Sequence, residues 1–128
     1  MKLNRNAERR LHPRLEHKLP IRVAANGYDF VTSTENVSCV GAYCHIDKYV
    51  PPFTKVMVRL SLPVRTSSGS KKYDVECKGV LVRTEDEKKG GFNVAIYFNE
   101  IKDSQRKKIE QYVSQFIPKE SIAQKPAR

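Results

Sequence analysis

Residues 19–34 read LPIRVAANGYDFVTST, and this stretch decides the fold class. Apolar side chains recur at every second position from Leu19 to Ala25, which is the period of a β-strand with one buried face. Asn26-Gly27 follows, a pair typical of two-residue hairpin turns because both residues tolerate a positive φ. Residues 28–34 are then expected to form the return strand. The stretch therefore predicts an antiparallel β-hairpin.

Further strands are predicted along the chain, separated by turns and loops. A turn is expected at residues 35–38, because Asn and Ser side chains readily bond neighbouring backbone amides. A mobile loop is expected at residues 65–72, which are rich in Ser, Gly and Lys. The additional strands are predicted at residues 41–46, 55–62, 73–84 and 92–98. Five to six short strands at close spacing favour a small β-barrel or sandwich, and closure removes exposed strand edges.

The end of the chain has a helical period instead. One apolar stripe at i, i+3, i+4, i+7 and i+8 is formed by Ile109, Tyr112, Val113, Phe116 and Ile117. Asp103 is the predicted N-cap and Pro118 ends the helix, which is expected to plug the end of the barrel or cover one face. We divide the chain into a basic arm (1–18), a barrel with its helix (19–118) and a disordered tail (119–128).

Composition restricts the class of protein. The chain has 128 residues, enough for one domain with a core of its own, and a formal net charge of +10, which favours anionic ligands. The arm carries six lysines and arginines against two glutamates, a pattern that solvated basic tails also have. No apolar run approaches the ~18 residues that span a bilayer, and no secretory signal is apparent, so we expect a cytoplasmic protein without membrane insertion.

Neither a metal site nor an enzyme is predicted. The three cysteines are Cys39, Cys44 and Cys77; they lack a second ligand pair at metal-binding spacing and are interpreted as small core residues. No nucleophile–base pair or phosphate loop is present, and the histidines have no evident catalytic partner. We therefore expect a binding module without catalytic residues, metal or cofactor.

Two local clusters offer groups that bind a nucleotide. The first is RRLHPR at residues 9–14, in which Arg10 and Arg14 present two forked cations that can grip phosphate or stack on a purine. The second is NVSCVG at residues 36–41, in which Asn36 and Ser38 can bond a base edge. Gly41 permits a positive φ or the close approach of a ligand. Taken singly, the first cluster reads equally as a charged linker and the second as a turn.

The two clusters together, in this order, resemble the motifs of the PilZ domain family, bacterial receptors for the second messenger cyclic di-GMP. The resemblance rests on Arg-x3-Arg at Arg10 and Arg14, followed by Asn-x-Ser-x2-Gly at Asn36, Ser38 and Gly41. It continues through the strand at residues 92–98 and the terminal helix, and covers residues 9–117. It implies an all-β fold with one C-terminal helix, a six-stranded antiparallel β-barrel of the split-barrel type.

The resemblance also implies roles for the motif residues. Arg10 and Arg14 are expected to wrap around cyclic di-GMP, and Asn36 and Ser38 to bind a guanine with Gly41 in close approach. The family motif allows Asp or Asn at the position of Asn36, and an Asn supplies only a neutral acceptor. Arg9, directly before the motif, resembles the arrangement that takes two intercalated ligands.

Outside the motif, Arg83 offers a further cation that stacks on an outer guanine or simply faces solvent. The expected partners are cyclic di-GMP and an unidentified effector protein, which reads the ordering of the basic arm by the ligand. Two alternatives stay open. A small basic barrel can bind single-stranded nucleic acid, although the clustered motif favours a discrete ligand. A barrel that has lost its ligand site would serve protein contacts alone, which the complete motifs argue against.

Overall fold

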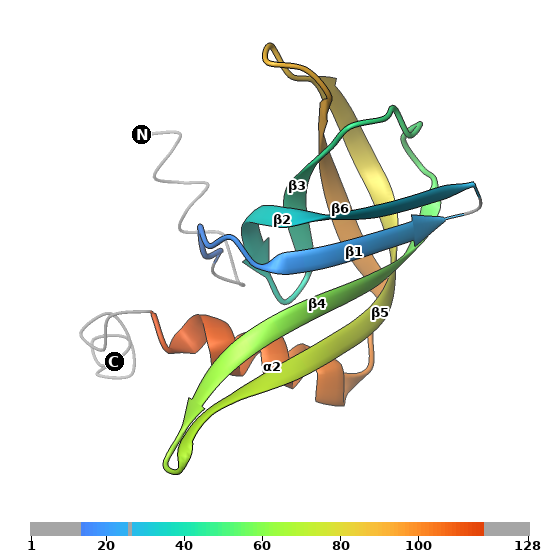
Figure 1. Cartoon of the computed structure of the whole chain (residues 1–128). Helices are drawn as coiled ribbons and strands as arrows, with labels where there is room; N and C mark the ends of the chain where they lie inside the picture. The colour runs from blue at the N-terminus through green and yellow to red at the C-terminus, as the bar shows by residue number, and fades with distance from the viewer. Residues whose placement is uncertain (1–13, 26, 117–128) are drawn as a thin grey trace, which may run out of the picture.

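The computed structural model describes residues 14–25 and 27–116. Six antiparallel strands close into a barrel in the order β1-β2-β3-β6-β5-β4, which confirms the predicted fold class. Figure 1 shows the barrel with helix α2 beside it. The elements are β1 (Pro20–Ala25), β2 (Tyr28–Ser38), β3 (Gly41–Ile46), β4 (Lys55–Thr66), β5 (Gly69–Asp86), β6 (Phe92–Glu100) and α2 (Asp103–Ser114).

The alternating apolar residues of all six strands form the core. In β1, Ile21 and Val23 face inward and their neighbours face out, as the sequence period requires. The predicted hairpin is present, because β1 and β2 pair until Ala25 is opposite Tyr28. The three cysteines are buried in the same core, which confirms their interpretation as small core residues.

The turn predicted at residues 35–38 is wrong. β2 continues through these residues to Ser38, and the actual turn is Cys39-Val40. A register shift between Thr34 and Asn36 interrupts the regular pairing with β3 at Glu35. This irregularity breaks the alternation of the strand, so its second half does not show a simple period of two in the sequence.

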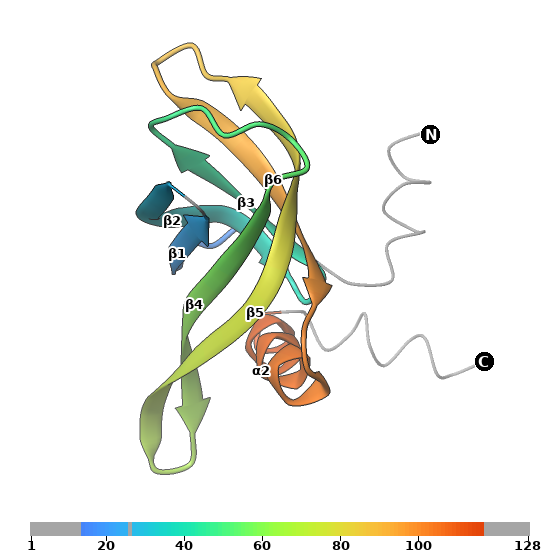
Figure 2. The same cartoon turned by 90° about the vertical axis from the view of Figure 1, so that its right-hand side faces the viewer.

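The mobile loop predicted at residues 65–72 is also wrong. β4 and β5 continue as a paired ribbon until Thr66 faces Gly69. Leu62 and Val64, which lie just before the predicted loop, are fully buried. Figure 2 shows this ribbon projecting beyond the other strands, with α2 beside it. The helix packs on β5, β4 and β2, and this packing stabilises the ribbon.

Helix α2 begins one residue away from its predicted cap. Lys102 has the extended backbone of the N-cap and offers no side-chain cap, whereas Asp103 is the first helical residue. Its carboxylate still interacts favourably with the helix dipole. Ile109, Tyr112 and Val113 are buried, as the stripe predicts. Phe116 remains 46% exposed, and Ile117 and the tail at 119–128 lie outside the described residues.

Candidate functional site

The segment before β1 runs alongside the second half of β2. The backbone N–H of Leu15 donates to the carbonyl of Val37 (2.9 Å), and the N–H of Val37 donates back to Leu15 (3.0 Å). Continuing this antiparallel bridge by one residue in each direction puts Arg14 opposite Ser38 and Glu16 opposite Asn36. One residue of the arginine motif therefore lies at the end of β2 that carries the second motif.

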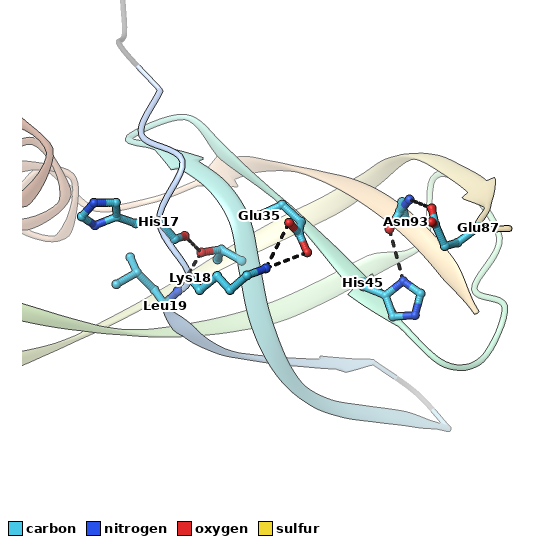
Figure 3. A network of polar contacts seen from close by, with 8 residues as sticks. His17, Lys18, Leu19, Glu35, His45, Glu87 and Asn93 are labelled. Carbon is cyan, nitrogen blue, oxygen red and sulfur yellow. Dashed lines mark hydrogen bonds and ion pairs between the residues drawn. The ribbon is translucent and has the colours of Figure 1, made fainter. Parts of the chain in front are cut away.

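Thr34 holds the base of this segment through its hydroxyl. The side chain is fully buried; its Oγ1 donates to the carbonyl of His17 (2.5 Å) and accepts from the N–H of Leu19 (3.0 Å). An exposed ion pair between Lys18 and Glu35 (3.2 Å) lies beside it (Figure 3). The hydroxyl satisfies two buried backbone groups, so the chain path at residues 17–19 is well determined.

Ser38 is committed to the turn that follows it. Its side chain is 1% exposed, and its Oγ accepts from the N–H of Val40 (3.2 Å). A hydroxyl that accepts one bond retains its own O–H for a second partner. Ser38, the last residue of β2, therefore stabilises the Cys39-Val40 turn and keeps its O–H for another partner.

Gly41 is required by strand packing. A Cβ at this position would lie 2.4 Å from the carbonyl oxygen of Ile96 on β6. The φ of Gly41 is not positive, so conformational freedom is not the reason for a glycine here. The close approach that the sequence suggested is made by the backbone of β6.

A hollow of about 750 Å³ lies on the outer face of the barrel next to these residues. Its lining includes Asn36, Tyr43 and His45 together with charged groups of both signs, Glu16, Lys18, Glu35, Glu87 and Lys89. Figure 3 shows the chain of polar contacts at one end of it. His45 Nδ1 lies 3.2 Å from Asn93 Oδ1, and Asn93 Nδ2 donates to Glu87 (2.7 Å). These bonds orient the amide and the imidazole before any ligand arrives.

The strand pairing extends the site across the outer face of the sheet. Asn36 is opposite Tyr43, Tyr43 is opposite Ala95, and Ala95 is opposite Arg83. Arg83 is exposed and pairs with Glu85 (3.1 Å), which also accepts from the Tyr43 hydroxyl (3.2 Å). The pKa of Tyr43 is raised mainly by partial burial and, to a smaller extent, by its hydrogen bond to the Glu85 carboxylate.

The segment before β1 also contacts the C-terminal helix. His17 Nδ1 lies 2.7 Å from the hydroxyl oxygen of Tyr112, and the imidazole packs edge-on against Phe116 with ring centroids 4.3 Å apart. Burial raises the pKa of Tyr112, so its hydroxyl stays protonated at neutral pH. The base of the arm is thus held by β2 on one side and by α2 on the other.

The cysteines lack the properties of a nucleophile. Burial raises the pKa of Cys39 to about 11, and the pKa values of Cys44 and Cys77 to about 12. Thiols of this kind are protonated at neutral pH and therefore react slowly. No group of three potential metal ligands occurs among the residues that the structure describes. In the same part of the chain, no helix is both long and apolar enough to cross a bilayer.

The structure thus brings Arg14, Asn36, Ser38 and Gly41 to one end of β2 and β3. Arg9 and Arg10 lie outside the described residues. Sequence reasoning missed the contribution of His45 and Asn93, which are opposite each other on β3 and β6. Their positions on the outward side of the alternating strands are the only signal that could have pointed to them.

Comparisons with known proteins found a matching family model and a similar fold. A model of the family described as "PilZ domain" matches residues 8–115. A solved structure of the Bacillus subtilis inhibitor of motility (MotI/DgrA) superposes with a TM-score of 0.70 at 15% sequence identity. The match covers 84% of this chain and 50% of that one, so the chain spans about half the length of that protein. No curated protein matches the sequence significantly.

Proposed function

This chain belongs to the PilZ domain family of cyclic di-GMP receptors, and from this premise we propose that it binds cyclic di-GMP and signals to a partner protein through its N-terminal arm. The observation that carries the proposal is the bridge between Leu15 and Val37. It supports a single site, because it brings Arg14, the second arginine of the motif, alongside the Asn-x-Ser-x2-Gly motif. The proposal is a receptor without catalytic activity or cofactor, acting in the reducing cytoplasm.

Arg14 is the proposed main phosphate ligand. Its side chain is exposed, and within residues 14–25 and 27–116 it forms no ion pair, so its guanidinium is available to an anion. Cyclic di-GMP carries two phosphate charges, and guanidinium–phosphate bonds are often bidentate. Arg10 is proposed to grip the same ligand. Arg9 would help to neutralise a second, intercalated ligand.

Asn36 is the proposed guanine ligand. Its side chain lines the hollow, where its carbonyl oxygen can accept a bond from guanine N1–H or N2–H. Ser38 would add its O–H, which is not used when its oxygen accepts from the N–H of Val40. Gly41 keeps β3 close to β6 and is proposed to let the ligand approach this end of the two strands. Arg83 is proposed to stack on an outer guanine, after release from Glu85.

The output is proposed to be the ordering of the arm. The arm is already held at residues 15–19 by Val37, Thr34 and Tyr112, so a ligand that grips Arg10 and Arg14 would extend this ordered segment toward the N-terminus. A ligand shifts a conformation only by its differential affinity for the two states, and the arginine contacts exist only in the ordered one. Hydrogen exchange of residues 5–18 tests this step; exchange that does not change with ligand would contradict it.

Calorimetric titration of the full chain with cyclic di-GMP tests the receptor function. We expect binding that Arg14→Ala weakens by about 30-fold or more, because losing one partner of a charge-assisted contact costs ~2–5 kcal/mol. Arg65→Ala is the matched control, since Arg65 is exposed at the far end of the β4–β5 ribbon. A stoichiometry near two ligands per chain would support the role of Arg9. The absence of heat at high concentrations would discard the proposal.

A further inference from the structure

Phe53 occupies a backbone position that normally requires glycine. Its φ is +71°, in the left-handed region. Its N–H donates to the carbonyl of Leu81 (2.5 Å), while the N–H of Leu81 donates to the carbonyl of Thr54 (2.9 Å). This is the bond pattern of a G1 β-bulge, whose first residue is usually a glycine because a Cβ is disfavoured there. The sequence therefore accepts strain at this position.

The strain is not offset by burial of the ring. The Phe53 side chain is 77% exposed, although it is one of the most apolar side chains in the chain. Neighbouring Val50 is buried and Thr54 bonds the carbonyl of Pro51 (2.6 Å), so the loop itself is anchored. A strained residue that presents an aromatic ring to solvent from an anchored loop points to a role in binding.

Other apolar side chains on β5 and β6 are exposed or partly exposed on the outer face. Val82 follows Leu81 at a bulge in β5 and is 43% exposed. Val80 lies two residues earlier on β5 and is opposite Tyr97 of β6, which is 50% exposed. We call Phe53, Val82, Val80 and Tyr97 the apolar strip. Tyr97 is also opposite Gly41, so the strip ends next to the cyclic di-GMP motif.

Cations border the apolar strip. Lys55 is exposed and directly opposite Val80, and Lys48 lies in the same loop as Phe53. Neither forms an ion pair within the part of the chain that the structure describes. Arg83 and Lys78 add further positive charge from β5, each with an exposed and therefore weak ion pair. A second copy of this chain, with its net charge of +10, would bring like charges together at this border.

We propose that the apolar strip is the docking surface for a segment of a partner protein that combines apolar side chains with Asp or Glu. The apolar side chains would cover Phe53 and Val82, and the carboxylates would meet Lys48 and Lys55. The docking surface indicates which kind of partner the proposed receptor would bind. Only the dependence of this docking on ligand rests on the proposed function. Because the strip ends at Tyr97, an occupant would sit beside bound cyclic di-GMP.

The test begins with a random peptide library selected on the full chain, with and without cyclic di-GMP. We expect the selected sequences to combine acidic and apolar residues. Synthetic copies should bind Phe53→Gly about 30-fold more weakly than the parent chain, as expected for loss of an aromatic anchor. Val31→Ser is the matched control, an equally exposed apolar residue on β2, and should not change binding.

Phe53→Gly also separates docking from a structural role. Glycine relieves the strain at φ +71°, so the midpoint of thermal unfolding should rise by about 3 °C while peptide binding falls. A role in folding would lower both. Library peptides without acidic residues, no selected peptide, or equal binding by Phe53→Gly would each overturn the proposal. So would a concentration-dependent dimer in sedimentation that Phe53→Gly abolishes, since the occupant would then be a second copy.

Calorimetry with cyclic di-GMP on the same samples keeps the two proposals distinguishable. Peptide binding that persists in a chain that takes up no cyclic di-GMP would retain the docking surface and discard the receptor function. Ligand binding in a chain that binds no peptide would do the reverse.

Discussion

The Nδ1 atom of His17 lies 2.7 Å from the phenolic oxygen of Tyr112, which ties the segment before β1 to the C-terminal helix. His17 is only three residues from Arg14 in the sequence, whereas Tyr112 lies near the end of α2. This contact therefore links the segment that carries Arg14 to the C-terminal helix. Ordering of the arm by a ligand would therefore also affect its contact with α2.

Tyr112→Phe should remove the contact between His17 and the helix without disturbing the core. The variant keeps the buried ring and removes one hydrogen bond, so we expect a loss of about 1 kcal/mol in the free energy of unfolding. Hydrogen exchange at residues 14–19 should become faster, because His17 loses its partner. Tyr28→Phe is the control, since that residue stacks on Phe30 with its ring. Unchanged exchange at 14–19 would show that the bond does not hold the arm.

Thr34→Val should destabilise the same segment more strongly. Valine is nearly isosteric, but the N–H of Leu19 and the carbonyl of His17 lose their buried partner. We expect a loss of about 2–3 kcal/mol, measured by urea denaturation. Thr32→Val, on the same strand, should change stability by less than about 0.5 kcal/mol. Equal effects of the two variants would mean that the Thr34 hydroxyl bonds are not important.

Gly41→Ala should impair folding before it impairs binding. The added methyl carbon would lie 2.4 Å from the Ile96 carbonyl oxygen, so β3 and β6 must move apart. We expect a loss of about 2–4 kcal/mol in stability, near the upper range for overpacking. Thermal unfolding measures it without ligand. A variant with parental stability and no ligand binding would instead indicate that the ligand itself needs the space at Gly41.

Asn36→Asp should tighten the binding of cyclic di-GMP. A carboxylate is a stronger acceptor for guanine N–H groups than an amide, and bonds to charged groups contribute roughly 1 kcal/mol more. We therefore expect about fivefold higher affinity by calorimetry at pH 7. The nearby Glu16 and Glu35 repel the new charge, so the gain should grow with salt. A large decrease in affinity would argue against a guanine contact at this position.

The cysteines should make stability fall at alkaline pH. Burial raises the pKa of Cys44 from an ordinary value of 9.0 to about 12, so the unfolded chain releases its proton at lower pH than the folded chain. The contribution of this protonated thiol is complete below pH 9 and is lost as the pH rises toward 12. Denaturant titrations at pH 8 and pH 10.5 should show the decrease, and Cys44→Ala should reduce it.

Thiol reactivity gives a second check on the cysteines. The folded protein should resist a disulfide reagent at pH 8, and denaturant should expose all three thiols. Rapid modification of Cys39 in the folded state would show that the turn after β2 opens readily.

The sequence by itself determined the fold class, the hairpin around Asn26-Gly27 and the residues of the motif. These depend on local rules, such as the alternation of apolar residues and the backbone freedom of a turn pair, which act over a few neighbouring residues. The helical stripe on α2 followed in the same way. The motif residues were identified through a family resemblance, which likewise depends on the order of residues in the chain.

Only the tertiary structure decided what these residues contact. The continuation of β2 to Ser38 and of the β4–β5 ribbon to Thr66 depends on partners in other strands and on α2, and no local period reports them. The need for glycine at position 41 comes from Ile96, more than fifty residues later. The strained Phe53 likewise depends on a distant residue, since its N–H donates to the carbonyl of Leu81. Such contacts are determined by barrel closure, which joins segments far apart in the chain.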